Sequence, residues 1–354
     1  MLQLGEAGYF FLFISFILLV LLFDLGIFSR KDHKIGFTEA SVWSAVWILL
    51  SLGFYYFILH FGHYIHGIST MDELLERIDR YQHPISVEGL QFSEALVVYE
   101  KNLALEYLTG YLIEKSLSVD NIFVILLIFL SFGVDERYYK RVLMWGILGA
   151  LVMRFLFIFT GAFLVARFQW VLYLFGVILL LTAIKMFIER NQTEKIDTER
   201  HPVVRFAARW FRVYPQFDGH RFLTRKGGRL MITPLLVVLL VIEFSDVIFA
   251  VDSIPAIFAV SRDPFIIFYS NIFAILGLRA LFFLLVNVLT RFYYLKIGLS
   301  VLLAFIGVKM LLHHWLAQWG FRTVHSLYVI VGILAVSIIA SMLHKPAENS
   351  EGES

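Results

Sequence analysis

The sequence predicts an all-α, polytopic transmembrane helical bundle of about nine spans that contains two inverted three-helix repeats. Three observations lead to this prediction. Apolar residues make up 59% of the 354-residue chain and charged residues only 16%, which is unusual for a soluble domain. Long apolar segments, each near the roughly 20 residues that span bilayer hydrocarbon, fill most of the length. One pattern of charged residues also occurs twice in the same order.

The predicted spans follow one another from the N-terminus. They are Tyr9–Phe28, Val42–Phe61, Leu103–Phe132, Val142–Val165, Trp170–Ile188, Ile232–Val260, Phe265–Thr290, Leu295–His313 and Val324–Leu343. The third is long enough to be two spans divided at the polar stretch 114–121. Short basic loops stay in the cytoplasm, and a single third span places every short basic loop on the same side as the basic segment 190–231. We therefore expect nine spans, an external N-terminus and a cytoplasmic C-terminus.

These spans divide the chain into five regions. They are two N-terminal spans with an extracytoplasmic segment (1–102), repeat 1 (103–189), a basic cytoplasmic loop (190–231), repeat 2 (232–313), and the last span with a cytoplasmic tail (314–354). The loop 190–231 is the expected surface for protein partners or for the anionic leaflet of the bilayer. A net charge of only +2 gives no reason to expect nucleic-acid binding.

The repeat is a spacing of three residue types. In each half an aspartate is followed 33 or 34 positions later by an arginine, and 30 or 31 positions after that by a lysine. These residues are Asp120, Arg154 and Lys185 in the first half and Asp246, Arg279 and Lys309 in the second. Because a unit of three spans ends on the side opposite to its start, two copies are inverted, and such proteins bind substrate where the repeats meet.

Five acidic residues lie inside two of the predicted spans. An ionised acid near the centre of a spanning helix costs roughly 2.5 to 3.5 kcal/mol, so these residues are expected to face a cavity, a partner charge or an ion. Helical spacing places Glu243 and Asp246 on one face and Asp252 on the opposite side. Pro255 and the alternating polar residues of 116–121 predict that both segments are kinked or locally unwound, which frees carbonyl groups as ligands.

Carboxylate, hydroxyl and amide oxygens suit magnesium, calcium or manganese ions. The candidate metal ligands are Glu114, Asp120, Asn121, Glu243, Asp246, Asp252 and Ser253. The alternative is that the acids only form structural ion pairs with Lys115, Arg154 and Arg279. Five acids outnumber these three bases, which favours a bound cation or proton, with the two arginines as orienting partners. We expect no catalytic residues and no resident cofactor, and the absence of cysteine excludes thiol chemistry.

Histidines form a second, weaker metal candidate on the external side. His60, His63 and His66 have the spacing His-x-x-His-x-x-His, and His313, His314 and His325 are predicted on the same side. Ordinary interfacial histidines are the simpler interpretation.

Three stretches resemble the signature sequences of the TerC/Alx family, closest to its bacterial Alx branch. They are Glu114–Phe123, Glu243–Phe258 and Asn271–Ala280. The resemblance implies a bacterial inner-membrane protein related to LysE-type exporters and associated with manganese efflux and, by the family's name, with tellurite resistance. The family's motif acids, asparagine and serine fall on the candidate ligands named above, and Arg154 and Arg279 carry over as their partners. A site rich in carboxylates would repel the tellurite oxyanion, so manganese fits better.

The function expected from these residues and this resemblance is export of a divalent cation, Mn²⁺ above others, from a buried acidic site at the repeat interface. Moving a dication out against an inside-negative potential costs about 4.6 kcal/mol per 100 mV, so proton exchange is the expected coupling. Two alternatives stay open. One is a membrane partner protein that assists the assembly or metalation of other proteins, and the other is an exporter of a small organic cation or amino acid.

Overall fold

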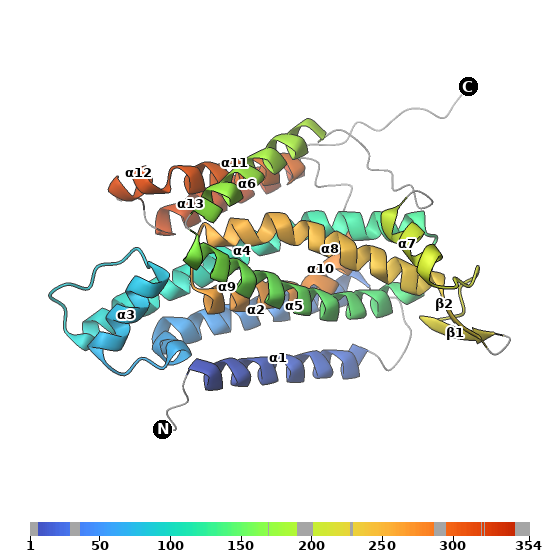
Figure 1. Cartoon of the computed structure of the whole chain (residues 1–354), viewed down its shortest axis with the longest axis horizontal. Helices are drawn as coiled ribbons and strands as arrows, with labels where there is room; N and C mark the ends of the chain where they lie inside the picture. The colour runs from blue at the N-terminus through green and yellow to red at the C-terminus, as the bar shows by residue number, and fades with distance from the viewer. Residues whose placement is uncertain are drawn as a thin grey trace.

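The computed structural model describes residues 6–28, 36–168, 170–189, 201–226, 229–286, 295–319, 321 and 323–343, and forms an elongated helical bundle (Figure 1). The long helices are α1 (Glu6–Phe28), α2 (Phe37–Phe61), α4 (Phe92–Ser131), α5 (Glu136–Arg167), α6 (Trp170–Ile188), α8 (Pro234–Phe258), α9 (Pro264–Leu276), α11 (Leu295–Leu311) and α13 (Thr323–Leu343). The shorter elements are η1 (Gly62–His66), α3 (Met71–Tyr81), α7 (Pro202–Trp210), β1 (Leu223–Lys226), β2 (Arg229–Ile232), α10 (Leu278–Val286) and α12 (His313–Gln318).

Over its described residues, every predicted span coincides with a helix or a bent helix pair, and positions 287–290 of the seventh span lie outside those residues. Among the described residues, α2 with η1, α5, α6, α8 and α13 are each long and apolar enough to cross a membrane, and α9 with α10 counts as a sixth candidate. The apolar parts described in α1 and α11 are shorter, and α4 is rich in charged residues. The all-α membrane bundle is therefore confirmed, whereas the number nine and the inverted repeat stay predictions.

Helix α4 settles whether the third segment is divided. It is one continuous helix of 40 residues, about 60 Å long at the usual rise per residue. It begins eleven positions before the expected Leu103, because Gln91 and Glu94 form a capping box at its N-terminus. The predicted local unwinding is wrong, since α4 and α8 are helical throughout. Pro255 lies in the last turn of α8, where little helix remains for it to interrupt.

The break lies instead in the second span of the second half. Helices α9 and α10 meet at Gly277 with a bend of 42°. Lys115 of α4 reaches this break, and its Nζ donates a hydrogen bond to the carbonyl of Ala274 over 3.3 Å. The irregular backbone that the sequence predicts at the acids is thus found in the helix that faces them.

Helices from the two halves pack on each other in a reciprocal way. Helix α4 packs on α9, α5 packs on α8, and α6 pairs with α11. This arrangement is what two related halves would produce, although it does not establish the symmetry. The outer faces of α1, α2, α5, α6 and α13 expose large apolar side chains, as a surface in contact with lipid does.

The two ends of the bundle differ in character. Helix α3 and η1 lie at one end, and α7 with the antiparallel β1–β2 hairpin lies at the other (Figure 1). The described parts of the predicted external and cytoplasmic segments are therefore at opposite ends.

Candidate functional site

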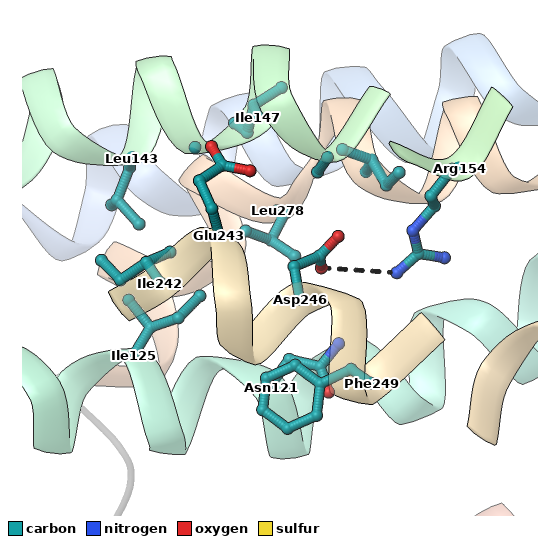
Figure 2. A pocket seen from close by; sticks show the side chains of 13 residues that line it. Asn121, Ile125, Leu143, Ile147, Arg154, Ile242, Glu243, Asp246, Phe249 and Leu278 are labelled. Atoms are coloured by element: carbon teal, nitrogen blue, oxygen red, sulfur yellow. Dashed lines mark ion pairs between the residues drawn. The ribbon is translucent and has the colours of Figure 1, made fainter. Parts of the chain in front are cut away.

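A small pocket lies between α4, α5, α8 and the α9–α10 pair (Figure 2). Its volume is about 30 Å³, enough for one or two water-sized bodies. Its polar lining consists of Asn121, Arg154, Glu243 and Asp246, and the remaining lining is apolar or glycine. The sequence-predicted acids Glu243 and Asp246 thus face a common space with Asn121.

Arg154 of α5 is at the centre of the charged contacts. Its guanidinium is buried and forms a close ion pair with Glu114, which is fully buried. Its Nη2 lies 3.8 Å from Asp246 Oδ1, and its Nη1 donates to Asn271 Oδ1 over 2.6 Å. One cationic side chain therefore bridges an acid from each predicted repeat.

Glu243 does not take part in that bridge. Its carboxyl group points toward α5 and occupies the space beside Gly149, where a Cβ atom would overlap it. Asp246 follows one helical turn later on the same side of α8 (Figure 2). If all three carboxylates Glu114, Glu243 and Asp246 are ionised, Arg154 compensates only one of their charges.

Several polar atoms around the pocket are buried without a hydrogen-bond partner. They include Glu114 Oε2, Asn121 Nδ2, Asp246 Oδ2 and Ser253 Oγ. Ser253 lies beside the Glu114 carboxyl, but not in hydrogen-bonding geometry. Buried polar atoms are usually satisfied, so these unmet atoms mark a place where an ion or water would bind.

The acids are not assembled as a preformed metal cage. Among the described residues, no three His, Asp or Glu side chains come close enough together to hold a metal ion. Arg154 instead lies between Glu114 and Asp246, where a cation bound by both would sit. A metal ion would therefore require the arginine to withdraw.

Other predicted ligands and partners lie away from this pocket. Asp252 faces α6, where Thr182 Oγ1 donates to its Oδ1 over 2.8 Å, as its helical spacing predicted. Asp120 and Arg279 do not line the pocket, and Lys115 is directed to the α9–α10 break.

The external histidines have separate partners. His60 Nδ1 lies 3.1 Å from the carbonyl oxygen of Tyr56, which is on its own helix. His63 and His66 contact different carboxylates. The side chains of His313 and His314 lie outside the described residues, and the described histidines form no shared metal site.

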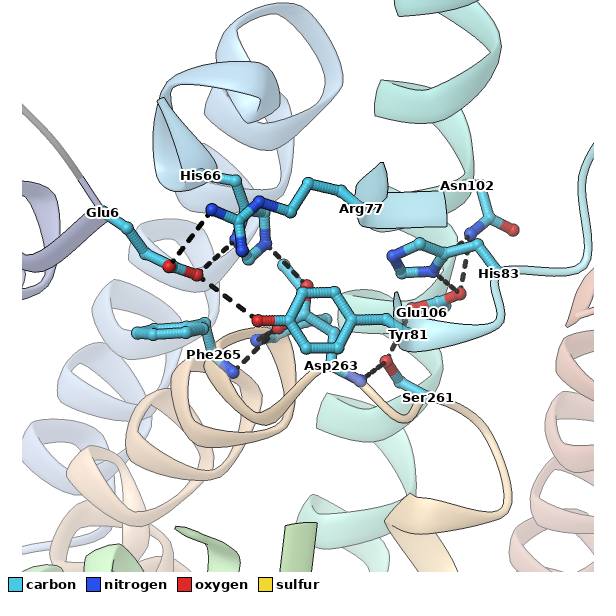
Figure 3. Close-up of polar contacts among 11 residues, drawn as sticks. Glu6, His66, Arg77, Tyr81, His83, Asn102, Glu106, Ser261, Asp263 and Phe265 are labelled. Carbon is cyan, nitrogen blue, oxygen red and sulfur yellow. Dashed lines mark hydrogen bonds and ion pairs between the residues drawn. The ribbon is translucent and has the colours of Figure 1, made fainter. Parts of the chain in front are cut away.

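Sequence reasoning missed a second buried polar cluster, at the α3 end of the bundle (Figure 3). It contains Glu106 and Asp263, each bonded to a histidine from the predicted external segment. A signal was present for Glu106, because it precedes Glu114 by eight residues in a helix that is otherwise mostly apolar there. Asp263 precedes Pro264 and resembles an ordinary N-cap residue, so nothing marked it.

Apolar helices around a buried acidic pocket define a polytopic integral membrane protein with ionisable groups in its interior. Residues 99–349 match the family described as "Integral membrane protein TerC family", and the chain belongs to that family. The predicted resemblance is therefore confirmed.

Full-length relatives agree with this assignment. An uncharacterized membrane protein of Myxococcus xanthus is 42% identical over 99% of this chain and 97% of its own. Two proteins named "Putative membrane-bound redox modulator Alx" are similar to this chain. The Escherichia coli K12 protein is 42% identical over 91% of this chain and 90% of its own, and the Photorhabdus laumondii protein 40% over 95% and 96%. No solved structure matches this chain.

Proposed function

We propose that this protein is a transporter, not an enzyme. It exports a divalent cation, preferentially Mn²⁺, from the cytoplasm across the bacterial inner membrane. The observation that carries the proposal is the excess of acidic side chains at the pocket. Glu243 and Asp246 line it. Glu114 lies beside it on Arg154, the one base that contacts Glu114 and Asp246. When ionised, the group has a formal charge of −2, which one dication neutralises.

The same charge count supports exchange for protons. Two protons bound to these carboxylates neutralise the charge of the site as one dication does. Exchanging the dication for two protons therefore leaves no uncompensated buried charge. Exchange of two protons for one dication also moves no net charge across the membrane. The inside-negative potential then does not oppose export.

The closed side of the pocket supports a direction. Toward the α3 end, Gly110 of α4 packs so tightly against Ser270 of α9 that a Cβ atom would lie 2.9 Å from the serine oxygen. The pocket lining extends instead toward Ile125, Leu143 and Ile242, the helix ends nearest the hairpin. With the hairpin end in the cytoplasm, a cation would enter from that side while the opposite side is closed.

In this scheme Arg154 is a tethered counter-ion that the substrate replaces. The arriving dication takes over Glu114 and Asp246, the arginine moves aside, and loosening of the contact between Gly110 and Ser270 opens the other side. An amino acid or other organic cation fits less well, because a pocket of about 30 Å³ holds only water-sized bodies. A redox role such as the one in the Alx name would act through the transported metal, because this chain has no cysteine.

Equilibrium binding of Mn²⁺ to the purified protein tests the proposal. We expect wild type and Asp252→Asn to bind one ion per chain, because Asp252 faces α6. Asp246→Asn and Glu114→Gln are expected to lose at least tenfold in affinity. Equal affinity in all four proteins, or no binding to wild type, would reject the cation site.

A further inference from the structure

The second polar cluster joins the predicted external segment to the transmembrane helices (Figure 3). His66 of η1 lies between two carboxylates, with Nδ1 2.9 Å from Glu6 Oε1 and Nε2 2.7 Å from Asp263 Oδ2. Ionised carboxylates only accept hydrogen bonds, so both ring nitrogens must carry a proton. His66 is therefore held as an imidazolium in this conformation, and it has no ring nitrogen left for exchange.

His83 makes a different set of contacts. Its Nδ1 lies 2.9 Å from Glu106 Oε1, and the same oxygen accepts a hydrogen bond from Asn102 Nδ2 over 2.6 Å. Ser261 Oγ donates to Glu106 Oε2 over 2.6 Å. Three donors thus surround the carboxyl group of Glu106, and its Oε1 accepts the hydrogen bond that places a proton of His83 on Nδ1.

The other nitrogen of His83 is available for exchange. His83 Nε2 is buried and makes no hydrogen bond among the described residues, although the side chain lines a wide cavity of about 710 Å³. Nearby Tyr99 Oη and Arg77 Nη1 are also buried without a partner. An imidazole with one nitrogen fixed by a carboxylate and the other unpaired can gain and lose one proton without breaking its anchoring contact.

The charged and titratable groups around His83 come from several elements. They are Glu106 and Tyr99 of α4, Tyr81 and Arg77 of α3, His66 of η1 and Asp263 before α9, with Lys309 of α11 near Glu106 and Lys101 lining the cavity. Burial favours the neutral imidazole, but the charge and hydrogen bond of Glu106 outweigh it and raise the pKa of His83. Glu106 thus favours protonation of His83, while the side chain lines a cavity.

Helix α4 connects this pair to the cation pocket. Glu106 and Glu114 are eight residues apart, which is about 12 Å along the helix axis. Between them lies Gly110, whose contact with Ser270 closes the pocket on this side. A rigid-body movement of α4 that opens this contact would displace both acids, because they lie on the same helix.

We propose that the His83–Glu106 pair is a proton-binding site at the external mouth, from which protons enter as the cation leaves the pocket. The proposal rests on the function proposed above. When α4 moves and opens the external side, His83 Nε2 takes one proton from external solvent, and that proton moves on to a carboxylate that the cation has left. His83 returns to the neutral form, so each proton taken up is delivered, and two such transfers balance one dication.

The test separates this role from simple anchoring of the external segment. His83→Asn retains an N–H group near the position of Nδ1, so the contact with Glu106 is preserved while the titration is lost. The matched control is His63→Asn, because His63 Nδ1 makes the same kind of contact with Glu100 of α4, at 2.6 Å, but outside the cluster. Protein is reconstituted in liposomes, and the proton movement driven by a Mn²⁺ gradient is followed with an entrapped pH indicator.

We expect wild type and His63→Asn to exchange protons for Mn²⁺ at the same rate, and His83→Asn to exchange them at least tenfold more slowly. An equal rate in His83→Asn would overturn the proposal while leaving the cation site intact. Nitrogen NMR of labelled histidines, recorded without Mn²⁺, gives a second readout. His83 is expected to titrate while His66 stays protonated, and a His83 that does not titrate would also overturn the proposal, even if Mn²⁺ did not bind at all.

Discussion

Replacing Arg154 with methionine tests the idea that this side chain stands in for the substrate cation. The substitution keeps a long apolar side chain and removes the charge that Glu114 and Asp246 share. Breaking a buried ion pair by removing one partner typically costs about 3 to 5 kcal/mol. Because the substitution also removes the hydrogen bond from Arg154 to Asn271, we expect the free energy of unfolding to fall by an amount near the upper end of that range.

A divalent cation should recover part of this loss. With the competing guanidinium gone, Mn²⁺ is expected to bind Arg154→Met at least tenfold more tightly than wild type, which is worth about 1.4 kcal/mol. Thermal unfolding in detergent is measured for both proteins with and without Mn²⁺, at concentrations around the wild-type Kd. The Mn²⁺-dependent rise in Tm should be larger in the variant.

The double variant Arg154→Met with Glu114→Gln is the matched control. It removes both members of the closest ion pair, so it should be more stable than Arg154→Met alone without Mn²⁺ and should gain less from the ion. If Arg154→Met is destabilised but gains no more stability from Mn²⁺ than wild type does, Arg154 is purely structural and does not stand in for the cation.

Three further predictions follow from individual contacts. Asp252→Asn should weaken a hydrogen bond to α6 at a cost of about 1 kcal/mol in thermal unfolding, and a tenfold loss of Mn²⁺ affinity would show that Asp252 reaches the site. Gly149→Ala places a methyl group where the Glu243 carboxyl lies, so Mn²⁺ affinity should fall several-fold in calorimetry, and an unchanged affinity would exclude Glu243 from the site. The raised pKa of His83, caused by Glu106 against the opposing effect of burial, contributes stability that is complete below pH 6.5 and lost as the pH rises through the raised value. Thermal unfolding followed across that range should show a smaller alkaline loss for His83→Asn than for wild type, and an equal loss would contradict this assignment.

The spans were predictable because the signal for them is local. Apolar segments of spanning length end at polar or basic residues, and each expected span coincides with a helix or a bent pair. The start of α4 was missed because its first eleven residues, which include Glu94, Glu100 and Lys101, resemble an external loop in composition. Only the capping box at Gln91 indicates a helix start there.

The site was predictable in part, for a related reason. Helical spacing placed Glu243 and Asp246 together and Asp252 apart, and the structure agrees. Helical spacing did not reveal the break at Gly277. Glycine is common in spanning helices, so its presence alone does not mark a break. The contact of His66 with Asp263 joins residues 197 positions apart, which no local pattern in one sequence contains.

Intracellular manganese is the measurement that tests the central claim most directly. Cells lacking the gene receive wild type, Asp246→Asn or Asp252→Asn, and total manganese is determined by elemental analysis under manganese load. We expect low manganese with wild type and Asp252→Asn, and high manganese with Asp246→Asn at equal protein levels. The same manganese content in every strain, including cells without the gene, would contradict export through the Glu114–Asp246 pocket.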